Sequence, residues 1–266
     1  MAVLSLAFLL ALPTFARAES VPPAPAPEST PSPKPPPPST PTAAPIPRLT
    51  GGLAVYLFAG HAGWNATALN ERLSSLGYST FAENPGSGGL GIRGWVDGCG
   101  CEGGMEFQFA MANANADDGR QLSLTAGQFM IHAGRILYAR RNLRTYAMLG
   151  LGYGATTLSL DPGGLPPRAK NPLGFADGSS GATSYALALQ ALVEVDYLVP
   201  FKQGGKGFNG VLVGLRAGYE VQPLVSSWSA KNGSGSTAPT YPVDLPRVAE
   251  DGAFVHLVFG DLALAR

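Results

Sequence analysis

The two cysteines are the first residues to consider for chemistry, because a single residue separates them. Cys99 and Cys101 lie among glycines, a composition typical of a tight turn. Oxidised, they would close a small ring; reduced, they would need more ligands to hold a metal, and only Asp97 and Glu102 are close. The spacing leaves open a structural clip or a pair without consequence. It predicts neither a metal site nor a bound cofactor.

The three histidines are the candidate general bases. His61 falls in a predicted loop, and His132 and His256 fall in predicted strands. A hydrolase would need a serine nucleophile, a histidine and an acid within reach of one another. No serine lies in a recognisable nucleophile turn, and His256 alternates with Val255 and Leu257, which suits a polar network. We therefore predict no catalytic residue and a protein that is not an enzyme.

Six charged side chains interrupt segments that otherwise alternate apolar and small residues. They are Arg93, Glu106, Glu194, Asp196, Arg216 and Glu220. Charges that recur on one face of a strand must either face water or pair with one another in an enclosed interior. The role of this set therefore depends on the fold that positions it.

The composition restricts the folds and functions open to the chain. The 18 Lys+Arg balance 18 Asp+Glu, and no basic run occurs, which excludes a nucleic-acid-binding surface. Charged residues make up only 14% of the 266 residues, and 35 residues are Gly. Outside the N-terminal segment, no apolar run approaches the roughly 20 residues of a transmembrane helix. A chain of this kind that crosses a membrane must cross it with strands.

The first 48 residues read as a targeting segment and a linker. Ala2–Leu12 is almost wholly apolar, and Ala16 and Ala18 supply the small residues that a signal peptidase reads. Residues 1–18 are therefore predicted to be a signal peptide cleaved after Ala18. Residues 19–48 hold 13 of the 24 prolines, which lack the N–H that helices and sheets require. This stretch is predicted to be a disordered tether, either a plain spacer or a segment that contacts the cell wall.

Residues 49–266 are predicted to form one domain of eight strands, because apolar side chains recur with a period of two. The predicted strands are Gly52–Gly60, Leu90–Asp97, Met105–Ala112, Leu122–Tyr138, Leu143–Leu160, Tyr185–Val199, Val211–Val221 and Ala253–Leu264. A change of phase near Gly127 predicts a β-bulge. The spacing of leucines predicts a short helix over Ala66–Leu76.

The connections predict how these strands are joined. Long segments follow the first, fifth and seventh strands and short ones follow the even-numbered strands, a pattern typical of an up-and-down barrel. The apolar face from Tyr185 to Tyr197 spans about 40 Å at ~3.3 Å per residue. Tilted by ~40°, it covers about 30 Å, close to the apolar band of a membrane barrel. We therefore expect the apolar faces to meet lipid and the opposite faces to line a narrow lumen.

This pattern, with the segments LNERLSSLGYSTF, GLRAGYEVQP and FVHLVFG, resembles the small outer-membrane β-barrel proteins of Gram-negative bacteria, the OmpA/OmpX-like class. The resemblance covers about Gly51–Arg266. It implies an eight-stranded antiparallel transmembrane barrel in the outer membrane, with outer-membrane lipid and the barrel assembly machinery as partners. It also implies a structural or interaction role without catalysis. Two alternatives stay open: an outer-membrane enzyme that modifies lipid, and a secreted soluble barrel that binds an apolar ligand.

In such a barrel the six charged residues would line the lumen, either as an ion pathway or as a plug of paired side chains. Eight strands leave an interior wide enough only for side chains, which favours the plug. Antiparallel pairing around the predicted turns sets Glu194 opposite Arg216, with Asp196 diagonal to the same arginine, and sets Arg93 opposite Glu106. We therefore predict structural ion pairs at these positions.

Overall fold

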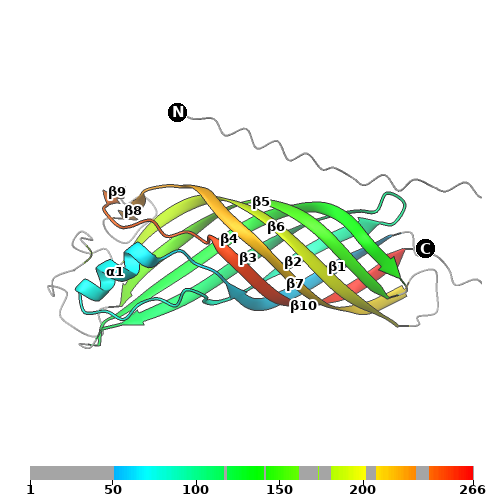
Figure 1. Ribbon diagram of the computed structural model, residues 1–266, viewed down its shortest axis with the longest axis horizontal. Coiled ribbons are helices and arrows are strands. Elements are labelled where there is room, and N and C mark those ends of the chain that lie inside the picture. The colour runs from blue at the N-terminus through cyan, green and yellow to red at the C-terminus, as the bar shows by residue number, and fades with distance from the viewer. Residues whose placement is uncertain are drawn as a thin grey trace, which may run out of the picture. The chain divides into compact units, whose positions relative to one another are not determined.

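The computed structural model is an antiparallel β-barrel with one short helix, and it describes residues 51–116, 119–140, 142–161, 173, 181–201, 208–231 and 240–265. The predicted signal peptide (residues 1–18) and tether (19–48) lie outside the described residues. No helix in the described part of the chain is long and apolar enough to cross a membrane. The barrel strands, shown in Figure 1, are β1 (Gly51–Ala62), β2 (Gly86–Val96), β3 (Cys101–Asn115), β4 (Gln121–Arg140), β5 (Leu143–Asp161), β6 (Gly181–Phe201), β7 (Phe208–Val225) and β10 (Gly252–Ala265).

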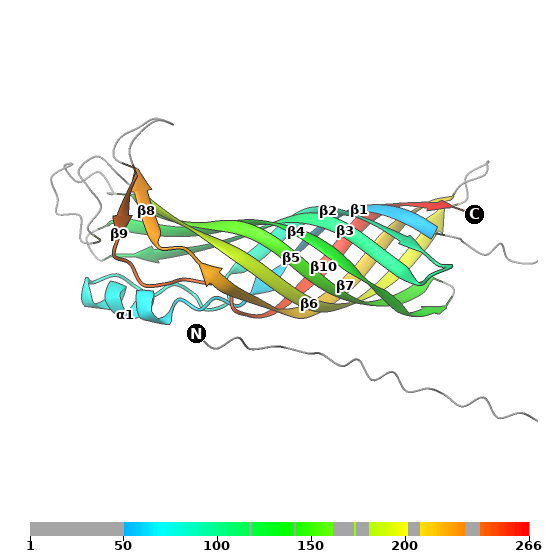
Figure 2. The same cartoon turned by 90° about the horizontal axis from the view of Figure 1, so that it is seen from above.

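The eight strands close on themselves, which confirms the predicted up-and-down barrel. Each pairs antiparallel with two neighbours, and the β1–β10 and β5–β6 pairings complete the ring. Following paired residues once around the ring leads from Ala265 on β10 to Val255, ten residues earlier on the same strand. By the relation between strand number, shift and tilt, the strands are inclined by about 40° to the barrel axis. Figure 2 shows that they run obliquely around the barrel. The interior of such a barrel is filled by side chains.

Glycines on the inner face of β5 make room for large side chains of β4. A Cβ atom at Gly152 would lie 1.9 Å from Sδ of Met130, and one at Gly150 would lie 2.6 Å from the ring of His132. These inward glycines thus let a methionine and a histidine of the neighbouring strand fold across the wall. In this part of the interior, the space is filled by side chains of β4, and β5 contributes only glycines.

The polarity of the side chains reverses along β4. Near the centre of the strand, Phe129 and Ile131 are exposed on the outer face while His132 is buried on the inner face. Nearer the start of the strand, Thr125 is exposed on the outer face and Leu124 is fully buried on the inner face. Around the centre of β4 the barrel is therefore apolar outside and polar inside. Around the start of β4 it is polar outside and apolar inside.

The β-bulge predicted near Gly127 is wrong, because this reversal produced the change of phase. The inward and outward positions alternate without interruption through this part of β4, and the register shift of the β4–β5 pair lies between Ile136 and Tyr138. Strands β3 and β5 reverse in the same way: Asn113 and Ser159 are exposed beside a buried alanine and a buried leucine. Apolar residues change faces along these strands while the backbone keeps its pairing.

The long connections form a hydrophobic core at one end of the barrel, together with the ends of the long strands. Helix α1 (Thr67–Ser75) and the hairpin of β8 (Trp228–Lys231) and β9 (Thr240–Val243) lie at this end of the barrel, where β8 pairs with the first residues of β6 (Figures 1 and 2). Leu69 and Leu73 of α1 are fully buried. They pack in a cluster that includes Trp64, Phe81, Leu122, Leu124, Leu158, Trp228 and Val248. The predicted helix is thereby confirmed, and this loop-end core caps the barrel interior.

Candidate functional site

Most of the buried polar side chains of the described residues lie in the interior of the barrel. The six charged residues singled out from the sequence all lie there, each 6% exposed or less: Arg93, Glu106, Glu194, Asp196, Arg216 and Glu220. Their partners were missed by the sequence reasoning: Tyr56, Glu102, Gln108, Gln128, His132, Gln190 and Gln222. Glu102, Gln108, Gln190 and Gln222 stand in phase with the charged residues of their own strands, and the other partners stand in phase opposite to the apolar outer face of theirs. The alternation itself was therefore the signal that could have found them.

Arg93 on β2 is the centre of the cluster nearest the β2–β3 turn. Its Nη1 lies 2.7 Å from Oε1 of Glu194, its Nη2 contacts Oδ2 of Asp196, and its Nε lies 3.5 Å from Oε1 of Glu102. The guanidinium also lies 5.0 Å from the ring centroid of Tyr56, a cation–π contact. In the order of the sheet, β2 and β6 are four strands apart and face each other across the lumen. One guanidinium therefore joins opposite walls of the barrel.

Arg216 on β7 makes a second contact across the lumen. Its Nη1 lies 2.6 Å from Oε2 of Glu106 on β3, the strand opposite β7. The same carboxylate accepts a hydrogen bond of 2.8 Å from the Tyr56 hydroxyl and another from the Gln108 amide. The Arg216 guanidinium lies 3.8 Å from the ring centroid of Phe58. Charge-assisted hydrogen bonds of this kind hold the middle of the lumen.

Both ion pairs predicted from the sequence differ in the structure. Arg216 does stand opposite Glu194 in the β6–β7 register, but its ion pair is with Glu106. Arg93 stands opposite Gly104, because the β2–β3 turn is centred one residue earlier than predicted. In a lumen this narrow, long side chains reach the facing wall, so a neighbour on the next strand is not automatically the partner.

Amide side chains surround Glu220 nearer the loop end. Gln128 donates from Nε2 to both carboxylate oxygens at 2.9 Å, Gln190 donates at 3.1 Å and Gln222 at 3.4 Å. The amides can turn either their N–H₂ or their oxygen toward a neighbour. This layer therefore satisfies a buried carboxyl group with neutral donors.

Glu250 lies on the segment before β10, where the polar interior meets the loop-end core. Its Oε1 accepts a hydrogen bond of 3.1 Å from the Trp64 indole, and its backbone N–H donates to Oε1 of Gln222 at 3.1 Å. Burial raises the pKa of Glu250 to about 7. No periodic pattern marks this residue in the sequence, because it belongs to a connection and not to a strand.

Ser87 and His256 have the separation of a nucleophile and its base, 2.8 Å between Oγ and Nε2. The Nε of Arg216, however, donates a hydrogen bond of 3.2 Å to Nδ1 of the same imidazole. Because Nδ1 accepts, the ring proton lies on Nε2, and the serine oxygen is the acceptor. A hydrolytic triad has the opposite arrangement, with an acid on Nδ1–H and the serine donating to Nε2. The contact orients Ser87 but does not activate it.

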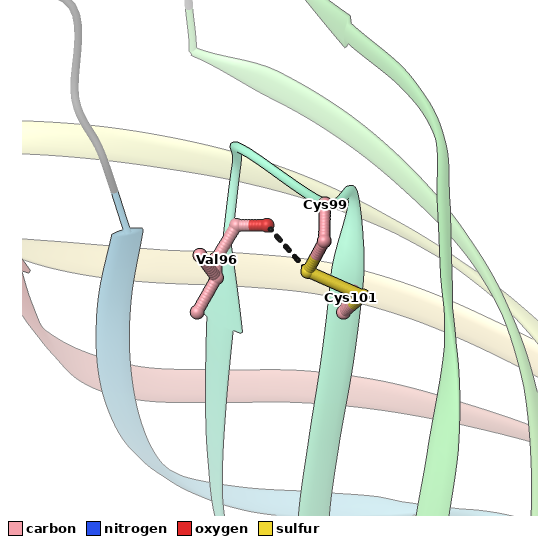
Figure 3. Close-up of a disulfide and its surroundings, with 3 residues drawn as sticks. All are labelled: Val96, Cys99 and Cys101. Atoms are coloured by element: carbon pink, nitrogen blue, oxygen red, sulfur yellow. Dashed lines mark hydrogen bonds between the residues drawn. A yellow bond between two sulfur atoms is a disulfide. The ribbon is translucent and has the colours of Figure 1, made fainter.

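The β2–β3 turn joins its two cysteines in a disulfide, shown in Figure 3. The Cα atoms of Cys99 and Cys101 are 5.2 Å apart, and the Cys99 sulfur lies 3.6 Å from the carbonyl oxygen of Val96. Both cysteine residues are exposed. Within the described residues, no group of three His, Cys, Asp or Glu side chains is placed to hold a metal ion.

Comparison with known proteins gives likenesses of fold. No protein-family model matches the chain, and no curated protein sequence matches it. Ail, the attachment invasion locus protein of Yersinia pestis, solved with the heparin analogue sucrose octasulfate, is 11% identical over 80% of this chain and 99% of its own, with a TM-score of 0.42. The outer membrane protein OprG of Pseudomonas aeruginosa is 12% identical over 82% and 98%, with a TM-score of 0.43. Neisserial surface protein A is 12% identical over 80% and 97%, with a TM-score of 0.38. The chain is similar to these proteins in fold alone.

Proposed function

We propose that this chain is an outer-membrane β-barrel protein with a structural or interaction role and without catalytic activity. The observation that carries the proposal is the reversal of polarity along the strands. Where the interior is polar, the outside is covered by large apolar side chains, among them Leu149 at 70%, Leu57 at 64% and Leu215 at 50% exposed. A continuous apolar surface of this kind is unfavourable in water and favourable in lipid.

Tyrosines lie along this apolar belt, as they do at the interfaces of membrane barrels. Tyr153 and Tyr185 stack on the outer face toward the loop end, with ring centroids 6.0 Å apart, and Tyr197 is exposed toward the opposite end of β6. Beyond the first pair, the outer face turns polar and the interior apolar. The loop end is therefore assigned to water. A secreted barrel for apolar ligands would need the apolar interior where this chain has its charges.

The lumen is proposed to act as a plug that holds the barrel in shape, and not as an ion pathway. Arg93 and Arg216 connect opposite walls at two levels. The hollow beside Ser87, Gln190 and His256 has room for about one water molecule. The loop-end core closes the interior above it. An ion would have to displace paired charges at each level, which is costly in a low-dielectric interior.

The proposed absence of catalysis is supported by the tautomer at His256. The proton on Nε2 leaves Ser87 without a base, since Arg216 occupies the position that an acid takes in a triad. The lipid-modifying enzyme is the alternative, and mass spectrometry of lipid A from a deletion strain distinguishes the two. Unchanged lipid A supports a non-catalytic protein, and an altered acyl pattern contradicts it.

The remaining parts of the proposal concern location and partners. The signal peptide, cleaved after Ala18, would deliver the chain for export, and the barrel assembly machinery would insert it. Outer-membrane lipid is the proposed partner of the apolar belt. The proline-rich tether of residues 19–48 is proposed to contact the cell wall. The loops at the capped end are proposed as the surface for other partners, and nucleic acid is not among them because the formal net charge is +0.

Cysteine accessibility in native membranes tests the proposal. In a background with both Cys99 and Cys101 changed to Ser, we expect Leu215→Cys to react with a lipid-soluble maleimide and to be spared by a charged one. The matched control Thr125→Cys, on the outer face beyond the belt, should react with the charged reagent. The protein should also need detergent for extraction and show heat-modifiable mobility on gels. Equal reaction of both positions with the charged reagent contradicts the membrane placement.

A further inference from the structure

The disulfide between Cys99 and Cys101 is a chemical feature that the proposed function leaves unused. It lies at the end of the barrel that carries the first residue of β1 and the last residue of β10, away from the loop-end core. Cys99 is in the turn and Cys101 is the first residue of β3 (Figure 3). Both residues are exposed, so thiols in solution can reach the bond.

The turn is held in shape by contacts that do not involve sulfur. The Gly100 N–H donates to the Asp97 carbonyl at 3.2 Å, and the Ile136 N–H of β4 donates to the Gly100 carbonyl at 2.8 Å. Arg144 of β5 donates to Oδ2 of Asp97 at 3.1 Å. The β2–β3 pairing extends to Val96 and Cys101, which close the hairpin at the base of the turn. A cross-link over a single intervening residue therefore removes little further entropy from the unfolded chain.

Arg135 is the residue paired with one of the two cysteines on the neighbouring strand. Cys101 and Arg135 are directly paired in the β3–β4 register, and both are exposed on the outer face. Side chains opposed in this way have Cβ atoms about 5 Å apart. A nearby guanidinium stabilises a thiolate over a thiol. On cleavage of the disulfide, Cys101 is therefore the better leaving group.

We propose that the Cys99–Cys101 disulfide is redox-active and oxidises dithiols of other exported polypeptides stoichiometrically, one dithiol for each disulfide, so that the protein takes part as a reactant and not as a catalyst. A substrate thiolate attacks Sγ of Cys99, the Sγ–Sγ bond breaks, and Cys101 leaves as a thiolate beside Arg135. The second substrate thiolate then attacks the substrate sulfur of the mixed disulfide and releases Cys99 as a thiolate. The substrate dithiol loses two electrons and two protons and becomes a disulfide. The Cys99–Cys101 pair gains the two electrons and becomes a dithiol when both thiolates take up protons.

This inference goes beyond the proposed function, and its chemistry can be measured apart from the membrane. The full-length protein in detergent micelles is mixed with a reduced two-cysteine peptide, and free thiols are trapped with an alkylating reagent and counted by mass spectrometry. We expect the Cys99–Cys101 pair to become reduced as the peptide becomes oxidised, in equal amounts. Glutathione at the same thiol concentration should react more slowly, because its second thiol must arrive from solution. Equal rates for the two reductants contradict a dithiol substrate.

Arg135 variants test the leaving-group argument. The reaction should slow by up to about fourfold in Arg135→Gln, the Boltzmann factor for two unit charges in water at the ~5 Å that separates paired Cβ atoms. Arg135→Lys should keep most of the rate. The matched control Arg140→Gln, at an exposed arginine on the same strand, should react like the unchanged protein. An unaltered rate in Arg135→Gln, or an equal loss in Arg140→Gln, overturns the assignment.

The stability of the double variant Cys99→Ser with Cys101→Ser separates a redox role from a structural clip. We expect its unfolding midpoint and its heat-modifiable mobility to match those of the unchanged protein, because the turn keeps its other contacts. A large fall in the midpoint would identify the disulfide as a clip and would overturn the proposal.

Discussion

Arg216→Met removes one buried ion pair of the lumen, the 2.6 Å contact between Nη1 of Arg216 and Oε2 of Glu106. Both side chains are at most 2% exposed, so the stranded carboxylate cannot reach water. Breaking a buried pair by removing one partner costs about 3–5 kcal/mol. Tyr56 and Gln108 still donate to Glu106, which places the expected loss near the lower end, about 3 kcal/mol.

The double variant Arg216→Met with Glu106→Gln should recover part of this loss. Glutamine is neutral, and its oxygen can still accept from the Tyr56 hydroxyl, so the uncompensated buried charge disappears. We expect the double variant to be about 1–2 kcal/mol more stable than the single variant. The control pairs Arg216→Met with Glu194→Gln. That change should give no recovery, because Glu194 lies 2.7 Å from Arg93 and its loss breaks a second ion pair.

Equilibrium unfolding by urea in detergent micelles, followed by tryptophan fluorescence and by mobility on gels, gives the midpoints for the three variants. The order of stability expected is the Glu106 double variant, then the single variant, then the Glu194 double variant. Recovery by Glu194→Gln in place of Glu106→Gln would refute the pairing across the lumen. It would favour instead the pairing of directly opposed residues on β6 and β7.

Three further predictions concern packing and the loop end. Gly152→Ala should cost at least about 1–3 kcal/mol in the same unfolding assay, because a Cβ there would lie 1.9 Å from the Met130 sulfur, whereas Gly86→Ala, with nothing within 4 Å, should be nearly neutral. Leu73→Ala should loosen the loop-end core by about 2–5 kcal/mol, seen as faster proteolysis of the loops with the heat-modifiable barrel unchanged. Because burial raises the pKa of Glu250 to about 7, above its unfolded value, the stability of the loop end should fall between about pH 4.5 and pH 7 and then level off. Glu250→Gln should weaken that dependence in hydrogen-exchange measurements of the loop end, and a slope unchanged in the variant would contradict the assignment.

The barrel could be predicted because its signal is local. A period of two over eight segments, with long and short connections in alternation, needs no knowledge of which strands meet, and Tyr185–Val199 alone shows the outward face of β6. The inward face was recoverable by the same rule, since Gln108 stands in phase with Glu106 and Gln190 with Glu194. The rule failed at Gly127. There the apolar residues change from one face of the strand to the other because the surroundings of the barrel change from lipid to water, and we predicted a β-bulge instead. Hydrophobic alternation reports which face is apolar but not which face points inward.

The partners of the lumen charges could not be predicted from pairing of adjacent strands, and the reason is the closure of the barrel. In an open sheet, the directly opposed neighbour is the nearest group of opposite charge on the same face. In a closed barrel, a guanidinium can also reach the facing wall. Each charged side chain can therefore pair either with a residue on the adjacent strand or with a residue four strands away. Arg216 prefers Glu106 on the facing wall because Glu194 is held by Arg93, and Arg93 reaches Glu194 and Asp196 from its own opposite wall. The pairing of any one charge therefore depends on the positions of all the others. Those positions depend on the ten-residue shift around the ring, because the shift determines which residues of β2 and β6, and which of β3 and β7, lie at the same level of the lumen.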